Sequence, residues 1–333
     1  MATKPLNVVL AGVIAVFVTF ALMILVILNH LNSSDAWSGS SVALTSVLAL
    51  LGFGGVGIVS SGVVSLLNAP RAKNQTGFDL RLSLISLLPA ILLAVVTVVL
   101  VEALIRAFQI PVAQIPTPTA VIQKFFESRQ VLWRDTQTTL LEAGVGYLIG
   151  ASLGIIVAIL VSRYQFLNKG LMPYATVFSS IPIVALAPVI VKAAGLEWGS
   201  KAAVVAITIF FPVLVNTARG LLEVNPLTID LMRSYAANPR RVFMDLRIPN
   251  ALPYIFNALK ISTTLALIGA IVAEFFGSTG SGLGFRILVE TGQASFDSVW
   301  AAINIASFLG ILFYNLAALL ERRVTGWHVS FRE

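Results

Sequence analysis

The chain has 333 residues, of which 57% are hydrophobic and 11% charged, and its mean hydropathy is +0.92. Because soluble domains carry roughly 25% charged residues, this composition excludes an ordinary soluble protein and indicates several membrane spans. The absence of cysteine and the presence of only two histidines exclude disulfides and disfavour a zinc-type site, and the net charge of +7 fits loops near anionic lipid better than a nucleic-acid surface.

Eight apolar runs approach or exceed the roughly 20 residues that a transmembrane helix needs. They lack the alternation of a membrane barrel, and a helix satisfies its backbone hydrogen bonds within the segment, so we expect helices. The runs cover residues 8–29, 42–67, 85–105, 140–161, 172–191, 203–218, 252–275 and 299–320. The sequence therefore predicts an all-α polytopic membrane protein with about eight transmembrane helices.

The first two runs form an N-terminal extension, residues 1–84, that precedes the rest of the protein. The run at 8–29 is longer than the apolar core of a signal peptide and no convincing cleavage site follows it, so we expect it to be retained. The run at 42–67 contains several glycines, which allow close helix packing in lipid. We expect two further spans here.

The middle of the chain contains two irregular features. Residues Thr119–Arg134 have an amphipathic pattern that predicts one helix lying along the membrane interface. The run at 172–191 contains Pro173, Pro182 and Pro188, so this span is expected to be kinked or broken. Irregular backbone in a membrane is tolerated where it is buried or lines a cavity, which makes Pro182 and Pro188 candidates for the transport pathway; kinks with a structural role alone remain the alternative.

Residues 219–253 form the longest polar interval in the second half of the chain, between two apolar runs. Asn225-Pro226 and Asn238-Pro239 each place a capping side chain before a proline at the first helical position. We expect a first helix to about Tyr235, an elbow of small residues at Ala236-Ala237, and a second helix that ends before Pro249. Basic and apolar residues alternate through both helices, so the pattern predicts an amphipathic helical hairpin at the membrane surface.

Two further features concern chemistry. The glycine-rich stretch 277–284 lacks the lysine of a phosphate-binding loop, and we expect a mobile external loop. Glu102, Glu142 and Glu274 all lie near span ends, which disfavours a carrier driven by buried ionisable groups at mid-depth. Glu274 is nevertheless the best polar candidate near a substrate exit, with an interfacial carboxylate facing water as the alternative. No nucleotide-binding GxxxxGK[ST] motif occurs in the sequence, so ATP hydrolysis would need another chain.

The distribution of basic residues predicts the orientation. If the N-terminus is cytoplasmic, most of the 22 lysines and arginines fall on the cytoplasmic side, including those of the hairpin. Both termini are then cytoplasmic, and we expect a multi-pass protein of the cell membrane.

The hairpin resembles the cytoplasmic coupling loop of ABC importer permeases, written E-A-A-x3-G-x9-I-x-L-P. Aligned on Pro249, Asp230 takes the glutamate position and Ala236 the glycine position without a gap, although the signature letters Glu, Ala-Ala and Gly are replaced. Further stretches match the nitrate, sulfonate, taurine, pyrimidine-precursor and riboflavin type of permease in order: IPTPTAVIQ (115–123), SIPIVALAPVIV (180–191), ALPYIFNALKIS (251–262) and IVAEFFGSTGSGLG (271–284).

The resemblance implies a six-helix core of the type I importer kind over residues 85–333, with the coupling hairpin at 219–253. It implies a non-enzymatic transport subunit that works with an ATP-binding subunit, an external solute-binding protein and a second copy of itself, without a cofactor of its own. Residues implied to contact the ATP-binding subunit are Asp230, Ala236, Ala237, Asn238, Arg240, Arg241 and Pro249. The lack of a charged pocket in the spans favours a neutral or aromatic solute such as riboflavin or a thiamine pyrimidine precursor. Sulfonate, taurine or nitrate remain open, and a carrier or channel without ATPase subunits is the alternative.

Overall fold

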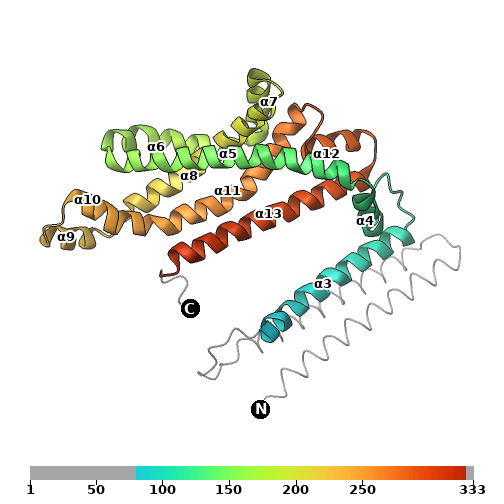
Figure 1. Ribbon diagram of the computed structural model, residues 1–333, viewed down its shortest axis with the longest axis horizontal. Coiled ribbons are helices and arrows are strands. Elements are labelled where there is room, and N and C mark those ends of the chain that lie inside the picture. Colours follow the sequence, from blue (N-terminus) through green and yellow to red (C-terminus); the bar gives the residue numbers. More distant parts are fainter. Residues whose placement is uncertain (1–79, 328–333) are drawn as a thin grey trace, which may run out of the picture. The chain divides into compact units, whose positions relative to one another are not determined.

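The computed structural model describes residues 80–327, with side chains from residue 94 onwards, and its regular elements there are all helical (Figure 1). Contacts divide the chain after Ala120 into two parts, which are described separately. The elements in order are α3 (Leu80–Ala107), α4 (Pro118–Glu127), α5 (Arg129–Arg163), α6 (Gln165–Ser179), α7 (Ile183–Ala194), α8 (Trp198–Leu222), α9 (Pro226–Ser234), α10 (Pro239–Val242), the π-helical turn η1 (Phe243–Arg247), α11 (Ile248–Phe276), α12 (Leu283–Gly292) and α13 (Phe296–Thr325).

In the first part, α3 contains the predicted span 85–105 and is tied to the segment that follows it. The Glu102 carboxylate accepts hydrogen bonds from the Thr119 backbone N–H at 3.0 Å and the Thr119 hydroxyl at 2.7 Å, and it also pairs with Arg106. A carboxylate at the first turn of α4 satisfies N–H groups that have no partner within the helix. Glu102 therefore connects the end of α3 to the start of α4. The predicted spans 8–29 and 42–67 lie outside the described residues.

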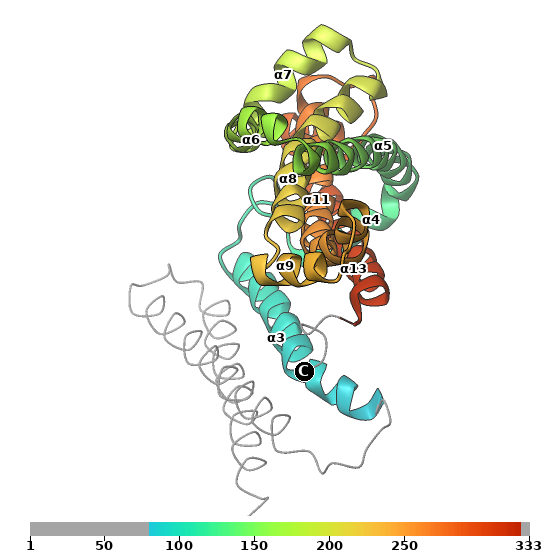
Figure 2. The same cartoon turned by 90° about the vertical axis from the view of Figure 1, so that its left-hand side faces the viewer.

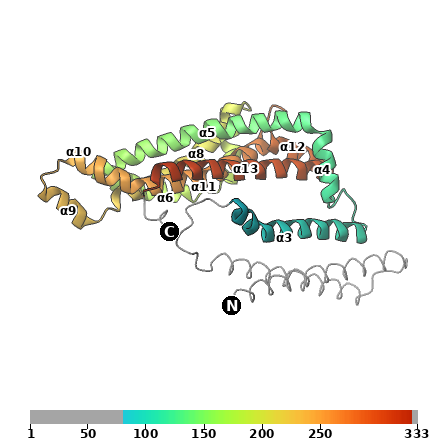
Figure 3. The same cartoon turned by 60° about the horizontal axis from the view of Figure 1, so that its bottom comes forward.

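The second part is a bundle of long helices in which α5 and α11 both pack against α8, and α13 packs against α11 (Figures 1 and 3). Among the described residues, four helices are long and apolar enough to cross a membrane: α5, α8, α10–α11 taken together, and α13. The predicted spans 140–161, 203–218, 252–275 and 299–320 lie within them. The prediction of an all-α membrane protein is thus confirmed for the described residues, whereas the total of eight spans stays a prediction.

Small residues allow α5 and α8 to approach closely. Gly146, Gly150 and Gly154 recur every four residues on α5, so they form one stripe along the helix. A Cβ atom added at Gly150 would lie 2.4 Å from the carbonyl oxygen of Ala206, which belongs to the α8 backbone. In lipid, where apolar side chains gain nothing from leaving water, such close backbone packing is a main source of helix association.

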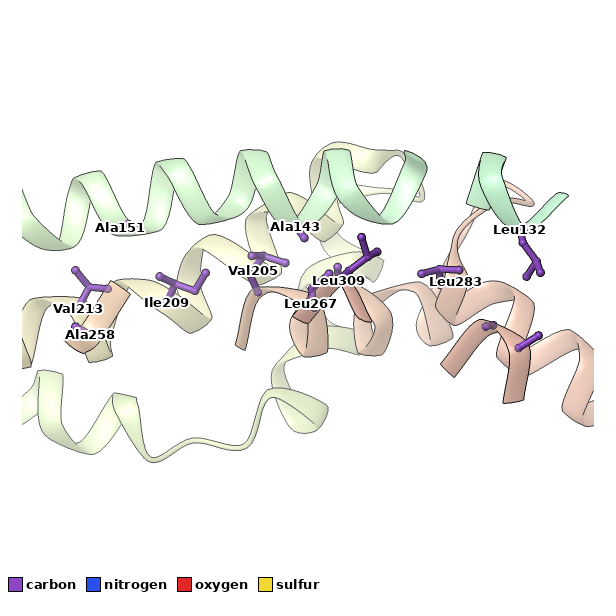
Figure 4. Close-up of a cluster of buried hydrophobic side chains, with 14 residues drawn as sticks. Leu132, Ala143, Ala151, Val205, Ile209, Val213, Ala258, Leu267, Leu283 and Leu309 are labelled. Atoms are coloured by element: carbon purple, nitrogen blue, oxygen red, sulfur yellow. The ribbon is translucent and has the colours of Figure 1, made fainter. Parts of the chain in front are cut away.

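A row of buried apolar side chains continues the contact among α5, α8, α11 and α13 (Figure 4). Val205, Ile209 and Val213 of α8 lie along its length, with Leu267 of α11 and Leu309 of α13 near one another. Leu132 and Leu283 close the row at the end away from α9 and α10. The core fixes these four helices as one unit.

The span predicted at 172–191 is broken, as its prolines led us to expect. α6 and α7 are bent by 99° relative to each other around the segment Ser180–Pro182, and α7 turns away from the long helices (Figures 1 and 2). Pro182 has an extended backbone and immediately precedes α7, while Pro188 lies inside α7. Proline cannot continue the hydrogen bonds of a preceding helix, which explains the position of the break.

The prediction of one helix over Thr119–Arg134 is wrong, because two different helices cover these residues. α4 ends at Glu127, and residues 129–134 form the first turns of α5. At 1.5 Å per residue the 35 residues of α5 extend about 52 Å, well beyond a hydrocarbon core of about 30 Å. The amphipathic pattern did not reveal this extension because the first turns of α5 bury polar side chains against another loop, as described below.

Candidate functional site

The end of the bundle formed by α8 and α11 bears the expected helical hairpin, in which α9 and α10 project beyond the other helices (Figures 1 and 3). The Asn225 side chain accepts a hydrogen bond from the backbone N–H of Leu227 at 3.0 Å, and Asn238 accepts one from Arg241 at 2.8 Å. Each proline that follows occupies the first turn of its helix. Both predicted helix starts are confirmed, because Asn-Pro supplies a cap and a residue that needs no N–H partner.

The elbow of the hairpin depends on Ala236. Its φ is +57°, in the left-handed region that glycine adopts more readily than any residue with a side chain. The backbone N–H groups of Ala236 and Ala237 donate to the carbonyls of Arg233 and Met232, which closes the end of α9. Ala236 occupies the position where the resembled motif has glycine, so the structure gives a conformational reason for glycine there.

The second helix of the hairpin does not end before Pro249, contrary to our expectation. The chain passes from α10 through η1 directly into α11, and the backbone N–H of Ile248 donates to the carbonyl of Phe243, five residues earlier. Pro249 then lies in the first turn of α11, where its missing N–H is tolerated. A single π-helical turn thus accommodates the proline, and the helix continues without a break. As a result, the hairpin is continuous with a membrane-spanning helix.

Side chains at the base of the hairpin join α8 to α11. The Asn250 side chain donates to the carbonyls of Gly220 at 2.9 Å and Glu223 at 3.2 Å, which have no helical partner at the end of α8. A Cβ added at Gly220 would lie 2.8 Å from the Cβ of Tyr254. Sequence reasoning missed Asn250 and Gly220; the asparagine directly after Pro249 was the available signal.

The hairpin exposes both apolar and basic groups. Leu227 is 76% exposed, Leu231 55% and Tyr235 80%. The ion pairs Asp230–Arg233 at 3.6 Å and Arg241–Asp245 at 3.7 Å are solvent-exposed and therefore contribute little to stability. Exposed aromatic and aliphatic side chains beside arginines are typical of a protein interface.

The structure brings one group of predicted site residues together and separates the other. Asp230, Ala236, Ala237, Asn238, Arg240 and Arg241 all lie on the hairpin, with Pro249 at its base. Glu274 lies in the last turn of α11, about 38 Å from Pro249 along the helix at 1.5 Å per residue. The pathway roles predicted for Pro182, Pro188 and Glu274 remain predictions.

Glu274 does not face water. It is 1% exposed, and its carboxylate accepts hydrogen bonds from the Thr139 hydroxyl at 2.7 Å and from the backbone N–H of Gly284. The Thr139 oxygen in turn accepts from the backbone N–H of Leu283 at 2.8 Å. The alternative of an interfacial carboxylate is therefore wrong.

The same contacts hold the glycine-rich stretch, which was expected to be a mobile loop. The Asp135 carboxylate accepts from the backbone N–H of Gly282 at 3.2 Å, and Arg134 donates to the carbonyl of Gly280 at 3.0 Å. Gly282 has φ +119° and a Cβ there would lie 2.4 Å from the Glu274 carboxyl carbon, so the loop needs glycine to fit over the carboxylate. The loop is a tightly packed cap on the end of α5.

Charged side chains complete this end of the bundle. Asp135 is fully buried and pairs with Arg286 at 2.8 Å, and Arg286 also contacts Glu290 at 3.3 Å. Burial lowers the pKa of the Arg286 guanidinium, but hydrogen bonds and charge from Asp135 and Glu290 outweigh it and hold the pKa above its ordinary value. Farther along α5, Glu142 lies 3.9 Å from Lys201 of α8, with both side chains 1% exposed.

Sequence reasoning missed most of these buried residues. Asp135, Thr139 and Glu142 lie three to four residues apart, so they share one face of α5. That spacing of polar residues could have identified a buried polar face, but the apolar run counted from residue 140 concealed it.

The architecture defines a class: a polytopic helical membrane protein with an exposed helical hairpin at one end of its bundle. The sequence profile of the binding-protein-dependent transport system inner membrane components matches residues 150–326. Because that match covers more than half of the chain, the protein belongs to this family and is a membrane component of an ABC-type transport system.

Individual relatives agree with the family. A probable ABC transporter permease protein of Haemophilus influenzae is 33% identical over 215 residues, which cover 64% of this chain and 86% of that protein. The formylaminopyrimidine transport permease protein ThiX of Halalkalibacterium halodurans is 31% identical over 214 residues, covering 64% and 85%. Relatives of lower identity are named for the transport of aliphatic sulfonates, riboflavin, bicarbonate and nitrate.

The fold also matches a solved structure. A chain of the MetNI methionine ABC transporter, in an inward-facing conformation, aligns with a TM-score of 0.52 and 20% identity over 60% of this chain and 98% of that chain. At that identity the likeness concerns the fold alone.

Proposed function

We propose that this protein is the permease subunit of an ATP-driven importer, and that the hairpin at 219–253 docks on the ATP-binding subunit. The observation that carries the proposal is the unbroken helix from α10 through η1 into α11. An ATP-binding subunit that moves the hairpin would move α11 with it, since no flexible joint separates them. The predicted contacts are Asp230, Ala236, Ala237, Asn238, Arg240, Arg241 and Pro249.

The proposed orientation follows from the basic residues. The hairpin side is cytoplasmic, both termini are cytoplasmic, and the end that bears Glu274 and Asp135 faces outward, where a solute-binding protein would deliver its cargo. The N-terminal residues 1–84 would add two spans to a core at 85–333. The protein would not hydrolyse ATP itself, since its sequence has no nucleotide-binding loop.

A second copy of the chain would complete the pathway. In the apolar stretch of α13 that is long enough to span the membrane, only 6% of the residues are buried inside the protein. The α11 and α13 surface also contains a groove with hydroxyl and amide groups from Thr264, Ser307, Tyr314 and Asn315. A surface of this kind fits a pathway between two subunits, so a homodimer is the assembly we propose.

The solute is proposed to be neutral or aromatic. The hydroxyl and amide groups of the α11–α13 groove can form hydrogen bonds without a net charge, and its lining contains no Asp, Glu, Lys, Arg or His. The relative named for formylaminopyrimidine supports a thiamine pyrimidine precursor, and the relative named for riboflavin supports a vitamin of similar character.

Co-purification tests the proposal. A tagged chain extracted from its host in mild detergent is expected to recover an ATP-binding subunit and, after mild crosslinking, a secreted binding protein. Replacing the exposed pair by Arg240→Glu and Arg241→Glu should abolish that recovery through charge reversal at the interface. Ala236→Trp should abolish uptake while insertion is intact.

The matched control is Arg322→Glu with Arg323→Glu, which reverses two exposed charges in the last turn of α13, outside the hairpin. This variant should recover the ATP-binding subunit normally. Recovery of the wild-type chain alone, together with solute flux in liposomes that does not depend on ATP, would support a secondary carrier or channel instead.

A further inference from the structure

A cavity of about 460 Å³ lies between the hairpin and the end of α5. Figure 3 shows α10 beside that end of α5, at the extremity where the hairpin projects. Part of its wall is apolar and is formed by Ile159, Ile229, Ala237, Pro239, Val242 and Phe243. Of the residues proposed to contact the ATP-binding subunit, only Ala237 lines it.

Three arginines from three different elements line the cavity. Arg163 is the last residue of α5, Arg233 belongs to α9, and Arg247 is the last residue of η1. Among the described residues, neither Arg163 nor Arg247 forms an ion pair with a carboxylate within 4 Å. Arg233 has only the exposed pair with Asp230. Among the described residues that line the cavity there are three arginines and no acidic side chain, so a bound anion would be attracted to it.

The cavity lies where a membrane span meets the hairpin. α5 is long enough to span the membrane and ends at Arg163, so in the proposed orientation the cavity lies at the cytoplasmic end of a span. Guanidinium groups bind phosphate through paired hydrogen bonds, and basic pockets between helices on the cytoplasmic side of membranes bind anionic headgroups. The apolar wall from Ile159, Ile229 and Phe243 would contact the glycerol and upper acyl region.

We propose that this cavity binds the phosphate headgroup of an anionic lipid and thereby fastens the hairpin to the end of α5. The cytoplasmic placement rests on the proposed function. Inorganic phosphate has the same charge chemistry, but it would leave the apolar wall without a partner, so a lipid fits the cavity better.

Native mass spectrometry of the full-length protein in neutral detergent tests the proposal. With phosphatidylglycerol and phosphatidylethanolamine at equal concentration, the wild type should retain phosphatidylglycerol preferentially. Arg163→Gln with Arg247→Gln should reduce that preference about thirtyfold, because each arginine near an anionic lipid surface contributes about five- to sixfold in affinity. Arg322→Gln with Arg323→Gln, two arginines at the exposed end of α13, should leave it unchanged.

Two results would overturn the proposal. One is the same lipid preference in the Arg163 and Arg247 variant as in the wild type. Another is displacement of phosphatidylglycerol by inorganic phosphate at equal concentration. If the Arg163 and Arg247 variant keeps the lipid preference and also loses the ATP-binding subunit, the two arginines belong to a protein contact instead. Failure of the proposed importer function would appear separately, as a wild-type chain that recovers no ATP-binding subunit.

Discussion

At the scale of single residues, Ala236 holds the hairpin elbow in a backbone conformation that disfavours alanine. A left-handed conformation costs a residue with a Cβ roughly 1–2 kcal/mol, whereas glycine adopts it freely. The surrounding contacts, including the backbone bonds that close α9, hold Ala236 in this state. The replacement of the motif's glycine therefore keeps the elbow geometry and sacrifices some stability.

Ala236→Gly should therefore stabilise the protein by about 0.5–1 kcal/mol, because it removes the backbone strain of the folded state. The net gain is smaller than the strain itself, since glycine also gives the unfolded chain more conformational entropy. Thermal unfolding of the purified chain in detergent measures the change. The matched control is Ala237→Gly, since Ala237 does not have a positive φ and glycine there adds only unfolded-state freedom. An Ala236→Gly variant less stable than the Ala237→Gly variant would contradict the interpretation.

At the scale of the helical elements, the α5–α8 contact depends on the absence of side chains at specific positions. Gly150 lies against the backbone of Ala206, which cannot move aside as a flexible side chain can. At Gly144, earlier on the same helix, an added methyl group would have no heavy atom of a neighbouring element within 4 Å. Replacing each glycine by alanine therefore separates the effect of packing on stability from the effect of helix propensity.

Gly150→Ala should destabilise the protein by about 1–3 kcal/mol through overpacking, despite the better helix propensity of alanine. Gly144→Ala should be neutral or stabilising by up to about 1 kcal/mol. Thermal unfolding of both variants under the same conditions is the measurement. Equal stability of the two would mean that α5 and α8 can separate without cost, against the close contact between their backbones.

At the scale of the whole molecule, an ion pair joins helices that are distant in sequence. Lys260 of α11 lies 2.6 Å from Glu321 of α13, and the side chains are 17% and 9% exposed. From the sequence, Lys260 is expected at the inner end of a span with its amine extended toward the headgroups, but its partner is a carboxylate 61 residues later. This pair fixes the end of α13 nearest the hairpin to the helix that continues into the hairpin.

Lys260→Met should lower the free energy of unfolding by about 3 kcal/mol, because it leaves the Glu321 carboxylate largely buried without a partner. Lys260→Met combined with Glu321→Leu should recover most of that loss, since an apolar pair of similar volume replaces the ion pair. The comparison uses thermal unfolding and transport in liposomes. Equal stability of the single and double variants would show that the pair has no energetic role.

The sequence by itself determined the class of the molecule and much of the hairpin. Continuous apolar runs required helices in a membrane, because lipid offers backbone groups no partner. The two Asn-Pro pairs specified both helix starts, since cap and proline act within a few residues of each other. The prolines of the run at 172–191 likewise predicted its break, and the ordered matches along the chain identified the family.

Only the tertiary structure decided how distant polar residues are used. Local pattern could not show that Asp135 and Thr139 bind the backbone of Gly282 and Leu283, more than 140 residues away. It also predicted a helix end before Pro249, where a π turn instead joins the hairpin to α11. Capping and proline effects act through neighbours in sequence, whereas the partner of a buried charge is set by which helices pack together.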